Sequence, residues 1–126
     1  MKAQGFSLIE LMITISVIGV LSTLSVGSYR ANILKTNRAE ARTQILSIQS
    51  VYESYYSQYN SYPAGALPAI PAAASTPNYS YSVNNTATTY TITARPTGNQ
   101  ADDTDCPTIT LDNLGNQGPS STCWGS

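Results

Sequence analysis

The hydrophobic and polar positions divide the chain into an apolar first part and an amphipathic second part. Residues 11–29 carry no charged side chain and consist mainly of Ile, Leu, Val, Ser and Thr. A helix over Phe6–Tyr29 is about 36 Å long, which is enough to cross a hydrocarbon core of about 30 Å. We therefore predict a membrane-spanning helix over residues 6–29.

After Tyr29 the pattern becomes that of an amphipathic helix with one apolar face. That face consists of Leu34, Ala41, Ile45, Ile48, Tyr52, Tyr55 and Tyr59. The opposite, polar face consists of Lys35, Arg38, Arg42, Gln49, Glu53 and Ser57. No Pro or Gly interrupts residues 28–62, so we predict one helix from about Phe6 to about Ser61, ended by Pro63 and Gly65.

Three later segments alternate between polar and β-branched or aromatic residues, which is typical of strands. They are residues 79–83, 88–94 and 108–111, with a predicted turn at Asn84–Asn85 and a further short edge segment over Ser120–Trp124. Three or four antiparallel strands behind one long helix predict an α+β fold. The tyrosines near the end of the helix would pack against this sheet.

The segments between these elements predict loops. Residues 63–77 are rich in Pro and Ala without periodicity, and residues 98–105 are polar. The polar segment contains Asp102, Asp103 and Asp105, a candidate calcium site because calcium prefers carboxylate oxygens. The alternative is a solvated acidic loop, and since no EF-hand-like spacing is present we predict no metal and no other cofactor.

Charge is sparse and unevenly distributed. Charged residues make up 10% of the chain, and it contains no His. Four cations follow the apolar segment directly, namely Arg30, Lys35, Arg38 and Arg42. Beyond them Arg95 is the only cation. Without a basic surface we do not expect nucleic acid as a partner, and without His a Ser-His or Cys-His catalytic site is excluded. We predict that the protein is not an enzyme.

The two cysteines, Cys106 and Cys123, favour a disulfide in an oxidising compartment over two free thiols. Closing this loop would stabilise the fold by about 3 kcal/mol in the chain-entropy model.

One carboxylate, Glu10, lies near the start of the apolar segment. A charge inside a membrane costs about 2.5–3.5 kcal/mol on insertion scales, so its presence calls for a functional reason. A secretory signal peptide would place Glu10 inside its apolar core, and a plain single-span anchor gives it no role. Both alternatives therefore explain this residue poorly.

The segment from Gly5 through Phe6 to Glu10 resembles the processing site of type IV prepilins. The resemblance implies a leader, residues 1–5, that a prepilin peptidase removes by cutting between Gly5 and Phe6, with N-methylation of Phe6. It also implies that Glu10 pairs with the terminal ammonium of a neighbouring subunit. Residues 6–29 would form the membrane and filament-core helix, and residues 30–126 the head.

The same resemblance implies a location and partners. The precursor would span the inner membrane once, with its head in the periplasm, until an assembly platform adds it to other pilin subunits in an extracellular pilus. Positive-inside counting would instead place Arg30 and Lys35 in the cytoplasm, and we follow the motif. Gly27 stands where the family often has Pro, so we predict that Gly19 and Gly27 weaken the helix, with local melting between them in a filament.

Residues 106–124 resemble the disulfide-bounded region of type IVa pilins, notably the short minor pilins of twitching and competence systems. We therefore expect a structural minor pilin that supports pilus assembly, twitching motility, adhesion or DNA uptake. The alternatives are a major pilin, a pseudopilin of type II secretion, which the cysteine pair disfavours, and a DNA receptor of a competence pilus, for which Arg95 supplies little charge.

Overall fold

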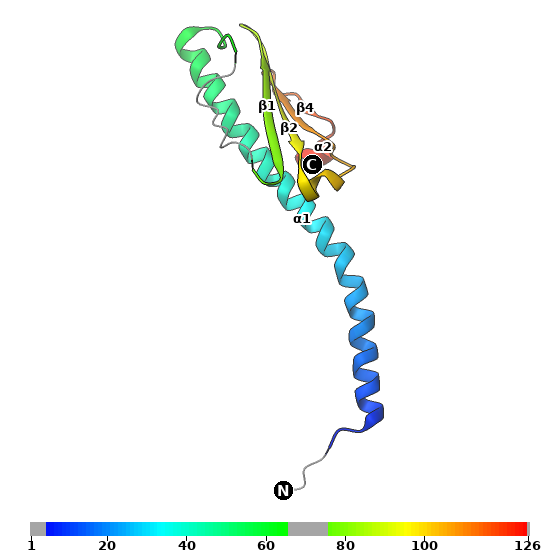
Figure 1. The fold of residues 1–126 in the computed structure, drawn as a ribbon. Helices are drawn as coiled ribbons and strands as arrows, with labels where there is room; N and C mark the ends of the chain where they lie inside the picture. Colours follow the sequence, from blue (N-terminus) through cyan, green and yellow to red (C-terminus); the bar gives the residue numbers. More distant parts are fainter. Residues whose placement is uncertain (1–4, 66–75, 126) are drawn as a thin grey trace. The chain divides into compact units, whose positions relative to one another are not determined.

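The computed structural model describes residues 5–65 and 76–125, which form two compact units that meet between Ile33 and Leu34. In chain order, its elements are α1 (Leu8–Tyr59), β1 (Tyr79–Asn85), β2 (Tyr90–Pro96), η2 (Gly98–Asp102), β3 (Ile109–Asp112), β4 (Gln117–Gly118) and α2 (Ser121–Trp124) (Figure 1). Most of the predicted leader, most of the Pro- and Ala-rich loop and Ser126 lie outside the described residues.

The first unit holds the apolar half of α1. Helix α1 is long and apolar enough to cross a membrane, and the most apolar stretch of the helix is not buried against the rest of the described chain. Its hydroxyl groups donate to carbonyls one turn earlier: Thr14 to Glu10 at 2.7 Å, Ser16 to Met12 at 2.8 Å and Ser22 to Ile18 at 2.7 Å. Polar side chains that bond to their own helix cost less in lipid.

The second unit contains a four-stranded antiparallel sheet in the order β1-β2-β3-β4. Alternate residues of β2 are fully buried, namely Tyr90, Ile92 and Ala94. In the register of the sheet, Ile92 faces Leu111 and Ala94 faces Ile109 on β3. This alternation places one apolar face of the sheet against α1, as the predicted α+β fold requires.

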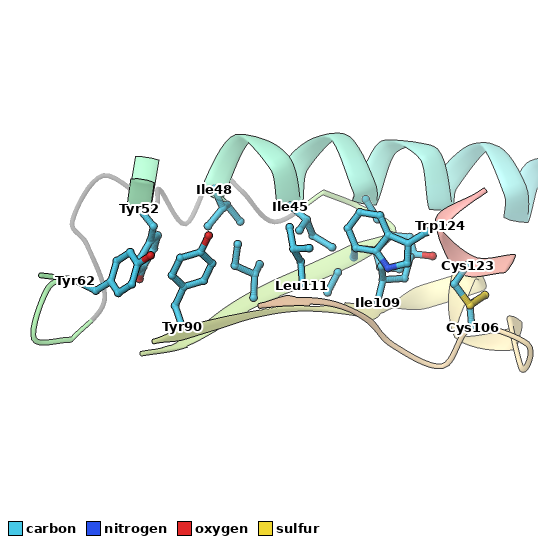
Figure 2. Packing of buried hydrophobic residues seen from close by; sticks show 14 residues of the cluster. Ile45, Ile48, Tyr52, Tyr62, Tyr90, Cys106, Ile109, Leu111, Cys123 and Trp124 are labelled. Carbon is cyan, nitrogen blue, oxygen red and sulfur yellow. A yellow bond between two sulfur atoms is a disulfide. The ribbon is translucent and has the colours of Figure 1, made fainter. Parts of the chain in front are cut away.

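The helix contributes Ala41, Ile45, Ile48 and Tyr52 to the core, all buried. Figure 2 shows Ile45 and Ile48 directed from the helix towards the sheet. The predicted apolar face is therefore confirmed up to Tyr52. Beyond it Tyr55 is half-buried and Tyr59 is 63% exposed, because the helix extends past the buried part of the sheet.

Tyrosine rings fill the end of the core near the end of α1 (Figure 2). The ring of Tyr90 lies 5.2 Å from that of Tyr52 and 4.9 Å from that of Tyr62. The hydroxyl of Tyr90 donates to the Glu53 carboxylate at 2.7 Å. Burial raises the pKa of Tyr90 above its usual range, and the hydrogen bond to the Glu53 carboxylate raises it further.

Two predicted boundaries differ from the structure. Asn84 and Asn85 belong to β1, and the chain reverses at residues 86–89, where the Thr86 hydroxyl accepts hydrogen bonds from the amides of Thr88 and Thr89. A threonine hydroxyl thus forms the turn that the asparagines were expected to form. Helix α1 ends at Tyr59 because Asn60 adopts a left-handed conformation with φ of 52°, upstream of Pro63.

We predicted a short edge segment of the sheet over Ser120–Trp124, and this prediction is wrong. Residues Ser121–Trp124 form the short helix α2, and the edge strand is the preceding β4. The turn between β3 and β4 is built on Asp112, whose carboxylate accepts hydrogen bonds from the amides of Leu114 and Asn116. Leu114 at this turn is 79% exposed.

The core predicts a clear difference between two adjacent residues of α1. Ile45 is fully buried, whereas Leu46 is 49% exposed. Ile45→Ala should lower the free energy of unfolding by about 2–5 kcal/mol, since it leaves a cavity between helix and sheet. Urea unfolding followed by circular dichroism measures this loss. Leu46→Ala is the matched control, and an equal loss in both variants would contradict the packing described.

Candidate functional site

The predicted processing site lies directly before α1. Gly5, Phe6 and Ser7 are not helical, and the carbonyl of Ser7 accepts the first backbone bonds of the helix, from Glu10 at 3.0 Å and Leu11 at 3.2 Å. Phe6 is 83% exposed. The bond between Gly5 and Phe6 therefore lies in exposed, non-helical chain, the form in which a peptidase can bind a substrate.

Glu10 lies in the first turn of α1 and its side chain is exposed. A carboxylate in this turn interacts favourably with the positive end of the helix dipole. Among the described residues no cation forms a salt bridge with it. As far as the described part of the chain goes, Glu10 is thus open to a cation from a neighbouring molecule.

Gly19 and Gly27 both lie inside α1, which is continuous through each of them. A Cβ added at either position would meet nothing within 4 Å. Neither glycine is therefore required by a close contact within this chain. Their predicted role in loosening the helix within a filament stays a prediction.

The polar cluster of the second unit centres on Arg38, whose predicted position on the solvated face is wrong. Arg38 is 8% exposed and makes a bidentate pair with Asp103, with Nε–Oδ2 at 2.6 Å and Nη2–Oδ1 at 2.5 Å. Arg38 follows Leu34 by four residues and precedes Ala41 by three, which is the spacing of the buried face. We predicted an exposed Arg38 because its side chain is charged, whereas its spacing along the helix indicates the buried face.

Asp103 and Gln100 come from the segment predicted as a polar loop, and both are buried. The side-chain nitrogen of Gln100 lies 3.0 Å from the Tyr79 hydroxyl, 3.2 Å from the Leu34 carbonyl and 3.1 Å from Asp103 Oδ2. The bond to Asp103 is the main cause that raises the pKa of Arg38, against the opposing effect of burial. This network fastens η2 to α1, with every member hydrogen-bonded.

The three aspartates of the candidate calcium site have different surroundings. Both oxygens of Asp103 contact Arg38, Asp105 approaches the same guanidinium at 3.8 Å from an 85% exposed side chain, and Asp102 is exposed. The described residues contain no group of three potential ligands placed to hold a metal ion. Asp103 and Asp105 thus act as counter-charges for Arg38, and we do not propose a calcium site.

Cys106 and Cys123 form the predicted disulfide, with an S–S distance of 2.03 Å, and both are buried. The bond joins the chain that follows η2 to helix α2 (Figure 2). Trp124 continues the attachment, because its indole donates to the Gly118 carbonyl at 3.1 Å and its own carbonyl accepts from Arg42 Nη1. The C-terminal region is thus held to the sheet and to α1.

The burial of Arg38 changes the distribution of available charge on the second unit. The remaining cations are Lys35 and Arg42 on α1 and Arg95 on β2. Lys35, Arg38 and Arg42 line one side of a hollow of about 330 Å³, with Thr122, Cys123 and Gly125 on the other side. Arg95 lines a separate hollow beside Thr104 and Thr108.

Comparison with known families gives two matches that together span most of the chain. Residues 27–110 match the family described as type IV minor pilin ComP, DNA uptake sequence receptor. Residues 1–26 match the prokaryotic N-terminal methylation motif. No curated protein matches the chain.

Among solved structures, the chain is similar to a type IV pilin from Shewanella oneidensis. The TM-score is 0.61 at 28% sequence identity, and the match covers 74% of this chain and 99% of the other. This likeness confirms the expected fold of one long helix, an antiparallel sheet and a C-terminal disulfide.

The buried pair predicts unequal effects of two similar substitutions. Asp103→Asn removes the buried carboxylate that pairs with Arg38 and leaves only the exposed Asp105 at 3.8 Å, so it should lower the free energy of unfolding by about 3–5 kcal/mol. Asp105→Asn changes an exposed carboxylate and should have an effect within about 0.5 kcal/mol. Chemical unfolding of both variants checks this. Equal stability of Asp103→Asn and the parent would disprove the role given to the pair.

Proposed function

The chain belongs to the family of the type IV minor pilin ComP, and from this membership we propose how it is processed, assembled and used. It is a structural, non-enzymatic subunit of a type IV pilus that assembles with other pilin subunits. The observation that carries this function is the family match over residues 27–110 together with the pilin fold. The matched family is one of minor pilins, so we prefer this role to those of a major pilin or a secretion pseudopilin.

We propose that a prepilin peptidase hydrolyses the bond between Gly5 and Phe6 and that the new terminal amine of Phe6 is methylated. The match of residues 1–26 to the methylation motif supports this processing, as do the exposure of Phe6 and the non-helical chain before Leu8. Hydrolysis creates an ammonium group at Phe6, four residues before Glu10. The mature chain would therefore carry both members of an ion pair at its N-terminus.

In the proposed filament, Glu10 pairs with the Phe6 ammonium of a neighbouring subunit. The apolar side chains of the first unit are exposed in the single chain, for example Leu11 at 60% and Ile18 at 58%. Lipid covers them before assembly, and neighbouring helices would cover them afterwards. An unpaired charge among such contacts costs several kcal/mol, on the order of 3–5, so the pair would set the stagger of adjacent subunits.

The precursor is anchored by its apolar helix and later enters a pilus. We further propose that the membrane is the inner membrane, that the head faces the periplasm and that an inner-membrane platform extracts the subunit. The match to the methylation motif supports this orientation, since prepilin peptidases cut at the cytoplasmic face. The head follows the spanning helix and would therefore lie at the opposite, periplasmic face.

DNA binding is a second candidate function, favoured by the family description, which names a DNA uptake sequence receptor. The sequence argued against it because only Arg95 lies beyond the helix. The structure leaves Lys35, Arg42 and Arg95 as the cations of the second unit that are not neutralised by a buried carboxylate. Three cations allow phosphate contacts, although they make a small basic surface.

The assembly proposal predicts a specific effect of Glu10→Gln. This variant should still be cut and methylated, since the peptidase site precedes it, yet it should be lost from sheared surface filaments because it cannot pair with an ammonium. Peptide mass spectrometry of membrane and filament fractions measures processing and incorporation together. Glu40→Gln, an exposed carboxylate of the second unit, is the control and should assemble normally. Normal incorporation of Glu10→Gln would contradict the proposal.

The DNA candidate predicts salt-sensitive binding of duplex DNA by the detergent-solubilised full-length protein at micromolar concentration. Arg95→Gln should reduce the slope of log affinity against log salt by about 1, as expected for a lost phosphate contact. Arg30→Gln removes the same charge from the first unit and should leave the slope unchanged. Mobility shift over a salt series measures both, and absence of any shift would remove this candidate.

A further inference from the structure

The cations that follow the apolar segment lie on an unexpected side of the membrane. In the orientation proposed above, Arg30, Lys35 and Arg42 lie outside the cytoplasm, although the positive-inside rule favours such residues within it. Arg38 is accounted for by its buried pair with Asp103. Neither assembly through Glu10 nor the packing of the core explains Lys35.

Lys35 and Arg42 lie on one side of α1, seven residues and hence about two turns apart. Both line the hollow of about 330 Å³, which the hydroxyl-bearing Thr122 lines from the opposite side. No carboxylate of the described residues forms a salt bridge with Lys35 or Arg42, and Asp105 approaches only Arg38. Within residues 5–65 and 76–125, the hollow therefore presents two cations without a paired carboxylate, together with a hydroxyl group.

The position of Arg42 in this hollow is fixed. Its Nη1 donates to the carbonyl of Trp124, and the next residue, Gly125, adopts φ of 93° directly against the guanidinium. The left-handed backbone favours glycine at this position, and without a Cβ the backbone of Gly125 can approach the Arg42 guanidinium closely. A guanidinium held in this way has lost its rotational freedom before any ligand arrives, which favours binding of an anion.

The chain also limits the distance of the hollow from the membrane. Lys35 follows Tyr29, the end of the predicted span, by six residues, which cover at most about 21 Å when fully extended and about 9 Å as helix. Because α1 is continuous from Leu8 to Tyr59, the distance along the helix is the shorter one, about 9 Å, and Lys35 lies within reach of lipid headgroups. Anionic headgroups attract Lys and Arg near the surface, and this attraction falls off within a Debye length of about 8–10 Å.

We propose that the Lys35–Arg42 hollow binds the phosphate of an anionic phospholipid headgroup in the leaflet from which the head emerges. The lipid holds the head against the bilayer until the subunit is extracted. This inference rests on the anchored precursor and its orientation as proposed above.

Trp124 is the only tryptophan of the chain and borders the hollow through its bond to Arg42, so it reports on the site. The full-length protein is placed in bilayers of phosphatidylcholine alone or with phosphatidylglycerol, both containing a dansyl-labelled headgroup. Energy transfer from Trp124 to dansyl should be higher in the anionic bilayer and fall to the neutral level at high salt. Equal transfer in the two bilayers would overturn the proposal.

Lys35→Glu should lower transfer in the anionic bilayer to the neutral level. Arg95→Glu makes the same charge change on β2, outside the hollow, and should behave as the parent. An equal loss in both variants would indicate attraction by net charge and overturn the site. Flotation of the same samples measures insertion, so loss of lipid dependence with insertion intact leaves the pilin function standing.

Duplex DNA is the competing occupant of this hollow. If Lys35→Glu abolishes DNA binding while Trp124 transfer in the anionic bilayer stays as in the parent, the hollow serves DNA and the lipid proposal fails. If the variant loses lipid dependence and binds DNA as the parent does, the proposal is supported.

Discussion

The ion pair between Arg38 and Asp103 organises the second unit around a buried charge. A guanidinium in a protein interior is tolerated only when its donors are satisfied, and here one carboxylate receives two of them. That requirement determines the packing of the segment from Gly98 to Asp105, since Asp103 must reach the helix. Gln100 then bonds to Tyr79 and to the Leu34 carbonyl, and Cys106 follows at the start of the disulfide loop.

Because of this pair, Arg38 stabilises the fold and is not available to bind outside partners. The chain has few cations, and Arg38, one of those nearest the membrane segment, is neutralised by Asp103 within the fold. Lys35 and Arg42, on either side of Arg38 along α1, keep their charges for outside partners. The arrangement explains how a protein with a net charge of −1 can still present a local cationic surface.

The sequence allowed prediction of the features that depend on periodicity or on a strict motif. Helix α1, the strand positions and the disulfide follow from apolar spacing, alternation and the cysteine count. The errors at Arg38, Gln100 and Asn85 have a common cause, because each time a polar residue was taken as exposed or as a turn former. Arg38 and Gln100 are buried, and Asn85 lies in β1, where its amide donates to the Pro63 carbonyl at 2.5 Å. The spacing along α1 indicates that Arg38 is buried, but the partners of these residues are distant in sequence, so local patterns do not identify the partners.

The disulfide between Cys106 and Cys123 encloses β3, the exposed turn at Leu114 and β4 within one covalent ring. A protease that cuts this turn would break the peptide chain without releasing a fragment. The nicked subunit would keep its mass under non-reducing conditions, and the two pieces would separate only after reduction. A nicked subunit in a pilus would therefore keep both of its pieces joined through the Cys106–Cys123 bond.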